Sequence, residues 1–135
     1  MIPVEKEKIY TIEDYYNTTD DDHVELIDGA FYDMAPPSRK HQRISMQLSL
    51  LIGNFIRANN GPCQVYAAPF GVQPSVDDNA TIVEPDISVI CDKNKLTDRG
   101  CAGAPDWIIE IVSPGSAAHD YIRKLNLYYK AGVRL

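Results

Sequence analysis

Apolar residues recur with the spacing of one helix face between residues 38 and 59, and this pattern predicts a long amphipathic helix. Ser38 is a suitable N-cap, because its hydroxyl can accept a hydrogen bond from a free amide of the first turn. The run at residues 59–62, Asn-Asn-Gly-Pro, predicts the end of the helix. The residues on the apolar face are Ile44, Leu48, Leu51, Ile52, Phe55 and Ile56.

A second helix is predicted near the C-terminus, where three apolar residues at helical spacing, Ile122, Leu125 and Tyr129, form one stripe. It is expected to run to about residue 131. Either of two serines can cap its start, and a glycine marks its end: Ser113, Ser116 and Gly132.

An Asp28-Gly29 pair separates two strand-like runs, residues 24–27 and 30–32. Such a pair between apolar runs is a strong local indication of a two-residue β-hairpin turn. Residues 63–68 and 71–74 are predicted to be further short strands.

Two later runs, residues 87–91 and 107–112, are rich in β-branched side chains and bounded by Pro or Gly. We predict that both are central strands covered on both faces. The intervening residues 92–105 are predicted to be a loop. The order of elements indicates an α/β or α+β fold with a mixed β-sheet flanked by helices.

A chain of 135 residues with 44% hydrophobic composition fits one compact domain, residues 1–135. Folds of this type place a strand after the last helix, yet the chain ends at residues 132–135. The expectation is therefore either a truncated chain that lacks the final strand or an open sheet edge covered by a partner subunit, which predicts a homodimer.

The three cysteines, Cys63, Cys91 and Cys101, are far apart and form no C-x-x-C pair, so we expect neither a disulfide nor a thiolate zinc site.

No run is long and apolar enough to span a membrane, and the charged N-terminus is unlike a signal peptide; we expect a soluble cytoplasmic protein without membrane partners. The net charge of −6 argues against indiscriminate nucleic-acid binding.

Glu110 lies within the apolar run at residues 107–112, where an unpaired carboxylate would cost several kcal/mol. It is either a salt-bridged or strand-edge carboxylate, or a metal ligand or general base. Asp86 follows Pro85 at the start of a predicted strand. Together, Asp86 and Glu110 would supply the oxygen ligands that Mg²⁺ or Mn²⁺ prefers.

A cation is also needed to hold the attacking water or the phosphate, and Lys124 on the last predicted helix is the candidate. Asp120 lies four residues earlier on the same helix face, so an ordinary surface ion pair is the alternative. His41 and Glu25 are supporting candidates, although each could equally be structural.

Basic residues along the last predicted helix, Arg123 and Lys130 among them, could contact phosphates or form a solvated face. The chain contains no Gly-rich phosphate loop, no H-E-x-x-H and no Ser-His-Asp order. Nucleotide-triphosphate, zinc-protease and esterase functions therefore have no support.

Five motifs in order resemble the Uma-type "putative restriction endonucleases", a bacterial family in the PD-(D/E)xK nuclease superfamily, over nearly the whole chain. They are Val24-Glu25-Leu26-Ile27-Asp28-Gly29, Ser38-Arg39-Lys40-His41, Val83-Glu84-Pro85-Asp86-Ile87-Ser88-Val89, Ile109-Glu110-Ile111-Val112-Ser113-Pro114 and Asp120-Tyr121-Ile122-Arg123-Lys124-Leu125.

The resemblance implies a restriction-endonuclease-like core and divalent-metal-dependent hydrolysis of DNA. It carries the active site over to Asp86, Glu110 and Lys124, with Glu25 supporting. It also implies that the lysine has moved from the strand to the following helix, which fits Val112 in this chain. The alternative from another class is a catalytically inactive nuclease fold that acts as a binding or assembly module.

Overall fold

Short strands alternate with helices along the chain in a computed structural model that describes residues 8–18, 22–113 and 118–134, with the backbone alone for 118–120. The elements in order are α1 (Ile12–Tyr16), β1 (Val24–Ile27), β2 (Ala30–Asp33), α2 (Arg39–Ala58), β3 (Gln64–Ala67), β4 (Gly71–Gln73), β5 (Ile87–Ile90), the 3-10 turn η1 (Lys93–Lys95), β6 (Leu96–Thr97), β7 (Gly100–Ala102), β8 (Trp107–Ile109) and α3 (Ala118–Ala131). The mixed α+β class predicted from the sequence is confirmed.

Three small sheets share the strands. β1 pairs with β2, the order β3-β5-β8 forms an antiparallel sheet, and the order β4-β7-β6 forms a mixed sheet in which β4 and β7 are parallel. Isolated bridges from Leu26 to Ile82 and from Val72 to Val83 tie the hairpin to the mixed sheet. The segment before β5, which contains Ile82 and Val83, therefore contacts the hairpin and the mixed sheet and leads into the antiparallel sheet.

The predicted hairpin and long helix are both confirmed. Asp28 and Gly29 take positive φ values of 49° and 82°, which is the turn geometry that fits the right-handed twist of the flanking strands. At the start of α2, the Ser38 hydroxyl accepts a hydrogen bond from the His41 amide at 3.1 Å. This cap fixes the first turn of α2, and with it the position of His41.

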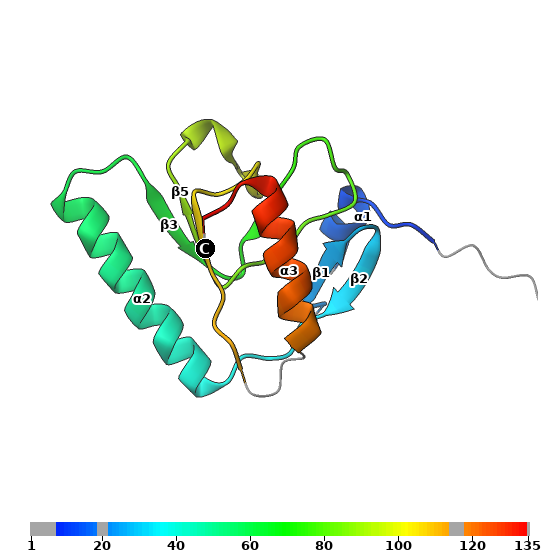
Figure 1. The fold of residues 1–135 in the computed structure, drawn as a ribbon, viewed down its shortest axis with the longest axis horizontal. Helices are drawn as coiled ribbons and strands as arrows, with labels where there is room; N and C mark the ends of the chain where they lie inside the picture. The colour runs from blue at the N-terminus through cyan, green and yellow to red at the C-terminus, as the bar shows by residue number, and fades with distance from the viewer. Residues whose placement is uncertain (1–7, 19–21, 114–117, 135) are drawn as a thin grey trace, which may run out of the picture.

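The main core lies where α3 crosses the strands, and Figure 1 shows α3 beside the β1-β2 hairpin while α2 lies on the side of β3. Tyr128 of α3 is fully buried in this core. The same buried cluster includes residues from the hairpin, from both three-stranded sheets, from the segment before β5 and from the end of the chain: Ile27, Val72, Val83, Ile90, Cys101, Ile108 and Val133. The core thus holds one face of α3 against the strand ends.

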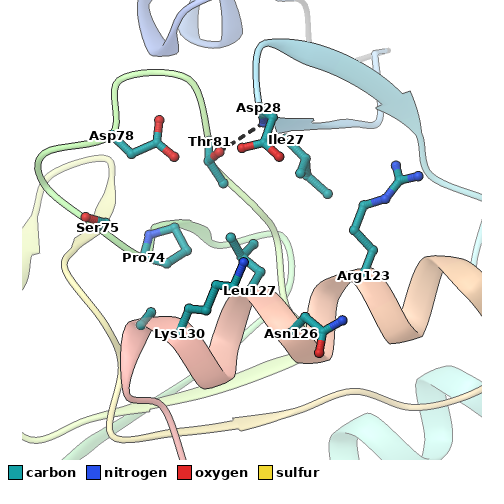
Figure 2. Close-up of a pocket in the computed structure, with 11 residues that line it drawn as sticks. Ile27, Asp28, Pro74, Ser75, Asp78, Thr81, Arg123, Asn126, Leu127 and Lys130 are labelled. Atoms are coloured by element: carbon teal, nitrogen blue, oxygen red, sulfur yellow. Dashed lines mark hydrogen bonds between the residues drawn. The ribbon is translucent and has the colours of Figure 1, made fainter.

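The stripe that identifies α3 in the sequence is not its buried face. Ile122 and Tyr129 are 59% and 79% exposed, and Leu125 is also exposed. The inward face instead carries Lys124 and Tyr128, one turn apart. A third face of α3 borders a cavity of about 670 Å³ beside the hairpin turn (Figure 2). Ser116, one of the two predicted caps, lies outside the described residues.

Two other sequence predictions are wrong in detail. Residues 92–105 are not a loop, because they form η1, β6 and β7, and β7 pairs in parallel with β4. The predicted strand at residues 107–112 ends at Ile109, and Trp107 is 39% exposed rather than covered on both faces. β5, by contrast, is buried throughout between β3 and β8, as predicted.

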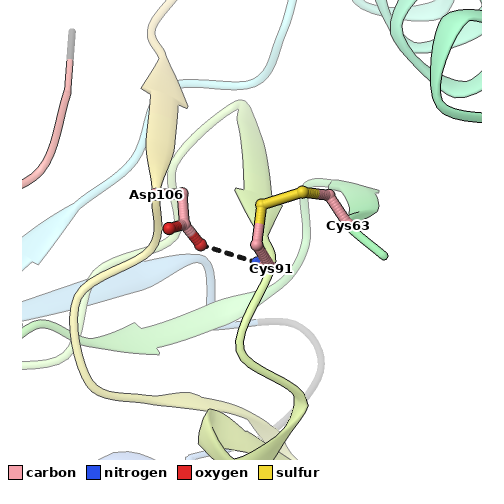
Figure 3. The surroundings of a disulfide bond; sticks show 3 residues. All are labelled: Cys63, Cys91 and Asp106. Carbon is pink, nitrogen blue, oxygen red and sulfur yellow. Dashed lines mark hydrogen bonds between the residues drawn. A yellow bond between two sulfur atoms is a disulfide. The ribbon is translucent and has the colours of Figure 1, made fainter. Parts of the chain in front are cut away.

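The prediction that no disulfide forms is also wrong. Cys63 and Cys91 are joined by a disulfide bond, shown in Figure 3, and Cys101 is free and buried. The cause is the antiparallel register of β3 and β5, which pairs Gln64 with Ile90 and so brings the two flanking cysteines together. No helix in the described ranges is both long and apolar enough to cross a membrane.

Candidate functional site

Asp86 and Glu110 lie at the adjoining ends of two neighbouring strands. The antiparallel register pairs Ile87 of β5 with Ile109 of β8, so the next residues, Asp86 and Glu110, face each other just beyond the ladder. The Asp86 amide donates a hydrogen bond to Glu110 Oε1 at 2.8 Å. In return, Asp86 Oδ2 accepts from the Ile111 amide at 2.6 Å. These two bonds hold the pair of carboxylates together.

His41 reaches the same place from the first turn of α2. Its Nε2 atom lies 3.0 Å from Asp86 Oδ1, and its side chain is 13% exposed. The other ring nitrogen, Nδ1, is buried and has no hydrogen-bond partner among the described residues. Asp86 is thus held on one oxygen by an imidazole and on the other by a backbone amide.

Lys124 joins Glu110 to a third carboxylate, Glu25 of β1. Its Nζ atom lies 2.5 Å from Glu110 Oε2 and 2.9 Å from Glu25 Oε2. Glu25 Oε2 also accepts from the Glu84 amide at 2.7 Å. Lys124 is only 12% exposed, and both carboxylates are similarly buried. The last helix, the hairpin and the end of β8 therefore meet at one ammonium group.

Burial and charge set the proton affinities of this group. Burial raises the pKa of Glu110, and the Lys124 ammonium opposes that rise. Burial would lower the pKa of Lys124, but the nearby Glu110 and Glu25 carboxylates outweigh it, and the pKa is raised. Lys124 therefore stays protonated over the whole neutral range.

Two tyrosines lie beside the site, and sequence reasoning did not assign either of them to it. The Tyr128 hydroxyl lies 3.5 Å from Glu110 Oε2, and burial together with that carboxylate raises its pKa. Burial, followed by the charge of the nearby Glu84, raises the pKa of Tyr15 of α1. Tyr128 follows Lys124 by one helical turn, which is the signal that could have found it.

The structure brings together Asp86, Glu110, Lys124, Glu25 and His41 of the residues predicted from the sequence. Asp120 lies in the first turn of α3, but its side chain is outside the described residues. Lys124 contacts Glu25, a residue ninety-nine positions away in the sequence.

The donor set suits a hard divalent cation. Among the described residues, no three His, Cys, Asp or Glu side chains form a group that could hold a metal ion by themselves. Mg²⁺, however, is commonly bound by one or two carboxylates, with water and phosphate oxygens completing its shell. Asp86 and Glu110 fit that pattern, because each oxygen of a carboxylate has two acceptor positions. Two carboxylates, Glu25 and Glu110, also share the one Lys124 ammonium group here, which leaves negative charge for a cation to offset.

Comparison with known proteins adds family and fold. The sequence profile of the Uma2 family, described as "Putative restriction endonuclease", matches residues 10–135. An uncharacterized protein of Synechocystis sp. is 32% identical over 104 residues, which cover 77% of this chain and 53% of the relative. This chain thus spans about half the length of that curated relative.

A similar fold occurs in the crystal structure of a "putative nuclease belonging to DUF820" from Anabaena variabilis. The two structures superpose with a TM-score of 0.70 at 20% identity, over 89% of this chain and 68% of the other. This chain therefore shares its fold with that structure.

Proposed function

Because this chain belongs to the Uma2 family of "putative restriction endonucleases", we propose that it is a divalent-metal-dependent endonuclease of the PD-(D/E)xK type that hydrolyses phosphodiester bonds in DNA. One observation carries the proposal. Asp86 and Glu110 adjoin at the ends of β5 and β8, and a protonated lysine contacts Glu110.

The roles of the residues follow from these contacts. Asp86 and Glu110 would hold Mg²⁺ or Mn²⁺ through carboxylate oxygens. Such an ion lowers the pKa of bound water and offsets charge on the scissile phosphate. His41 and the Ile111 amide fix the orientation of Asp86. Lys124 would place its ammonium group against the phosphate or the attacking water, and Glu25 positions Lys124 by accepting hydrogen bonds from it.

Cleavage of a supercoiled plasmid tests this function. Purified protein with Mg²⁺ or Mn²⁺ is expected to nick and then linearise the plasmid, and excess EDTA is expected to stop the reaction. Plasmid that remains supercoiled across a range of divalent-ion concentrations would count against an endonuclease.

A second candidate, a catalytically inactive binding or assembly module with a nuclease fold, is favoured by one observation. Lys124 already neutralises Glu110 at 2.5 Å, and the chain carries a net charge of −6. The two candidates differ in metal binding. Calorimetric titration with Mn²⁺ is expected to show a binding event for the enzyme, whereas a module of this kind would give none.

We also propose that the protein forms a homodimer through α2. Phe55 and Leu51 on this helix are 69% and 67% exposed, and apolar side chains grouped on one helix often mark an interface. Light scattering at high concentration is expected to give twice the 15.1 kDa chain mass. Phe55→Glu should yield the monomer mass, while Gln42→Glu, elsewhere on the exposed surface of α2, should leave the dimer intact. A monomer mass for the unmodified protein would contradict the proposal.

The proposed location is the cytoplasm, where the DNA of a bacterial cell lies. Cell fractionation with an antibody against the protein tests it. Recovery in the periplasmic fraction would contradict this assignment.

A further inference from the structure

A cavity of about 670 Å³ lies beside the candidate site, between the hairpin turn, the loop at residues 74–81 and α3. This volume is within the range of about 300–1,000 Å³ typical of small-ligand pockets. Figure 2 shows Asp28 and Asp78 on the wall formed by the turn and the loop, with Arg123 and Lys130 rising from α3 opposite them. The cavity is therefore acidic on one wall and basic on the other.

Local hydrogen bonds fix the acidic wall. The Asp28 amide donates to the Thr81 hydroxyl at 3.1 Å, and Asp78 Oδ1 accepts from the Ala80 amide at 2.8 Å. Asp28 lies in the tight hairpin turn, where its backbone has a positive φ. Both carboxylates keep acceptor positions that these bonds do not use.

The charged side chains described on the two walls do not pair with each other across the cavity. Among the described residues, none of the ion pairs within 4.0 Å joins Asp28 or Asp78 to Arg123 or Lys130. Arg123 instead lies over the Tyr32 ring, with its guanidinium carbon 4.9 Å from the ring centre. A ligand that spans this cavity would need an anionic end for α3 and hydrogen-bond donors for the carboxylates.

A nucleotide has this arrangement. Its phosphate suits Arg123 and Lys130, because arginine and lysine are the usual phosphate partners in proteins. A base with an exocyclic amino group can donate to an aspartate, as the N4 amino group of cytosine does. Uracil has a carbonyl at that position, and two carboxylates would repel it.

The cavity also shares its elements with the candidate site. Asp28 directly follows the strand that carries Glu25, and Arg123 directly precedes Lys124 on α3. A strand whose scissile phosphate lay at Lys124 could therefore place a neighbouring nucleotide in the cavity.

We propose that this cavity binds one nucleotide of a DNA strand whose base carries an exocyclic amino group, with its phosphate on Arg123 and Lys130 and its amino group on Asp28 and Asp78. The proposal rests on the endonuclease function proposed above and names part of its substrate. Cytosine is the simplest base that meets the requirement.

Calorimetric titration with dCMP and with dUMP tests the cavity without any cleavage. The two nucleotides differ where one has an amino group and the other a carbonyl group. In buffer with EDTA, so that no divalent ion contributes, dCMP is expected to bind about tenfold more tightly than dUMP. A pentanucleotide with one central cytosine is expected to bind more tightly than dCMP, because a strand makes additional phosphate contacts.

Two variants assign the contacts. Lys130→Ala is expected to weaken dCMP and dUMP equally, by about fivefold to tenfold, because it removes a phosphate contact. Asp78→Asn should remove the preference for dCMP over dUMP. Arg57→Ala, a matched loss of one exposed cation on α2, should change neither affinity. Thermal unfolding of each variant shows whether the fold is retained, and Lys130→Ala, at an exposed helix position, decides the case if Asp78→Asn is unfolded.

Equal affinity for dCMP and dUMP, or no binding of dCMP at millimolar concentration, would overturn the proposal. A pentanucleotide that binds no more tightly than dCMP would exclude a strand as the ligand and would overturn it as well. Failure of the endonuclease function can be told apart from failure of this proposal, because the titration contains no metal and involves no cleavage. Glu110→Gln should therefore retain the preference for dCMP.

Discussion

Glu110→Gln is expected to lower the rate of metal-dependent plasmid cleavage about a thousandfold, which corresponds to about 4 kcal/mol of lost transition-state stabilisation. Glutamine has nearly the same size, and its amide oxygen can still accept from the Asp86 amide. It cannot supply the negative charge that a divalent ion needs. Cleavage rates with Mg²⁺ and with Mn²⁺, measured on folded protein, provide the comparison.

Glu13→Gln is the matched control, because Glu13 is exposed in the first turn of α1, away from the site. It should cleave at the rate of the unmodified protein. If Glu110→Gln cleaved as fast as this control, Glu110 would have no catalytic role and the proposed site would be wrong.

Lys124→Met is expected to lower the free energy of unfolding by about 3–5 kcal/mol at pH 7, because removing one member of a buried ion pair leaves its partners unpaired. Methionine keeps most of the apolar stem, so the loss reports the charge. Here two carboxylates, Glu25 and Glu110, lose the same partner. Urea unfolding in EDTA, followed by circular dichroism, measures the change.

The loss of unfolding free energy in Lys124→Met should become smaller as the pH falls. Burial raises the folded-state pKa of Glu110, so the folded protein binds a proton more readily than the unfolded chain. Such a group costs stability above the unfolded pKa of about 4.3 and ceases to do so as the pH drops toward it. The added change Glu25→Gln should restore part of the loss at pH 7. A pH-independent deficit, or none, would show that Lys124 does not compensate these carboxylates.

Local sequence chemistry predicted the elements that depend on neighbours in the chain. Asp28-Gly29 specifies its turn through positive φ values, and Ser38 caps α2 through a hydroxyl three residues from its partner. The pairing of Asp86 with Glu110 was predicted because two carboxylates on neighbouring strands would supply the oxygen ligands of a divalent cation. The register of β5 and β8 provides the geometry of that pairing, with Ile87 opposite Ile109.

Contacts between distant segments were not predictable from local pattern. The disulfide depends on the register of β3 and β5, and the two cysteines are 28 residues apart. Apolar spacing did not identify the inward face of α3, because that face carries the charged Lys124, which is buried where Glu25 and Glu110 pair with it. The apolar stripe that marked the helix faces outward instead.

Anomalous difference density from a crystal soaked in Mn²⁺ tests the central claim most directly. The account predicts one strong peak in direct contact with an oxygen of Asp86 and an oxygen of Glu110, and loss of that peak in Glu110→Gln. A peak elsewhere in the molecule, or no peak with both carboxylates ordered, would contradict a metal-dependent nuclease site at these strand ends.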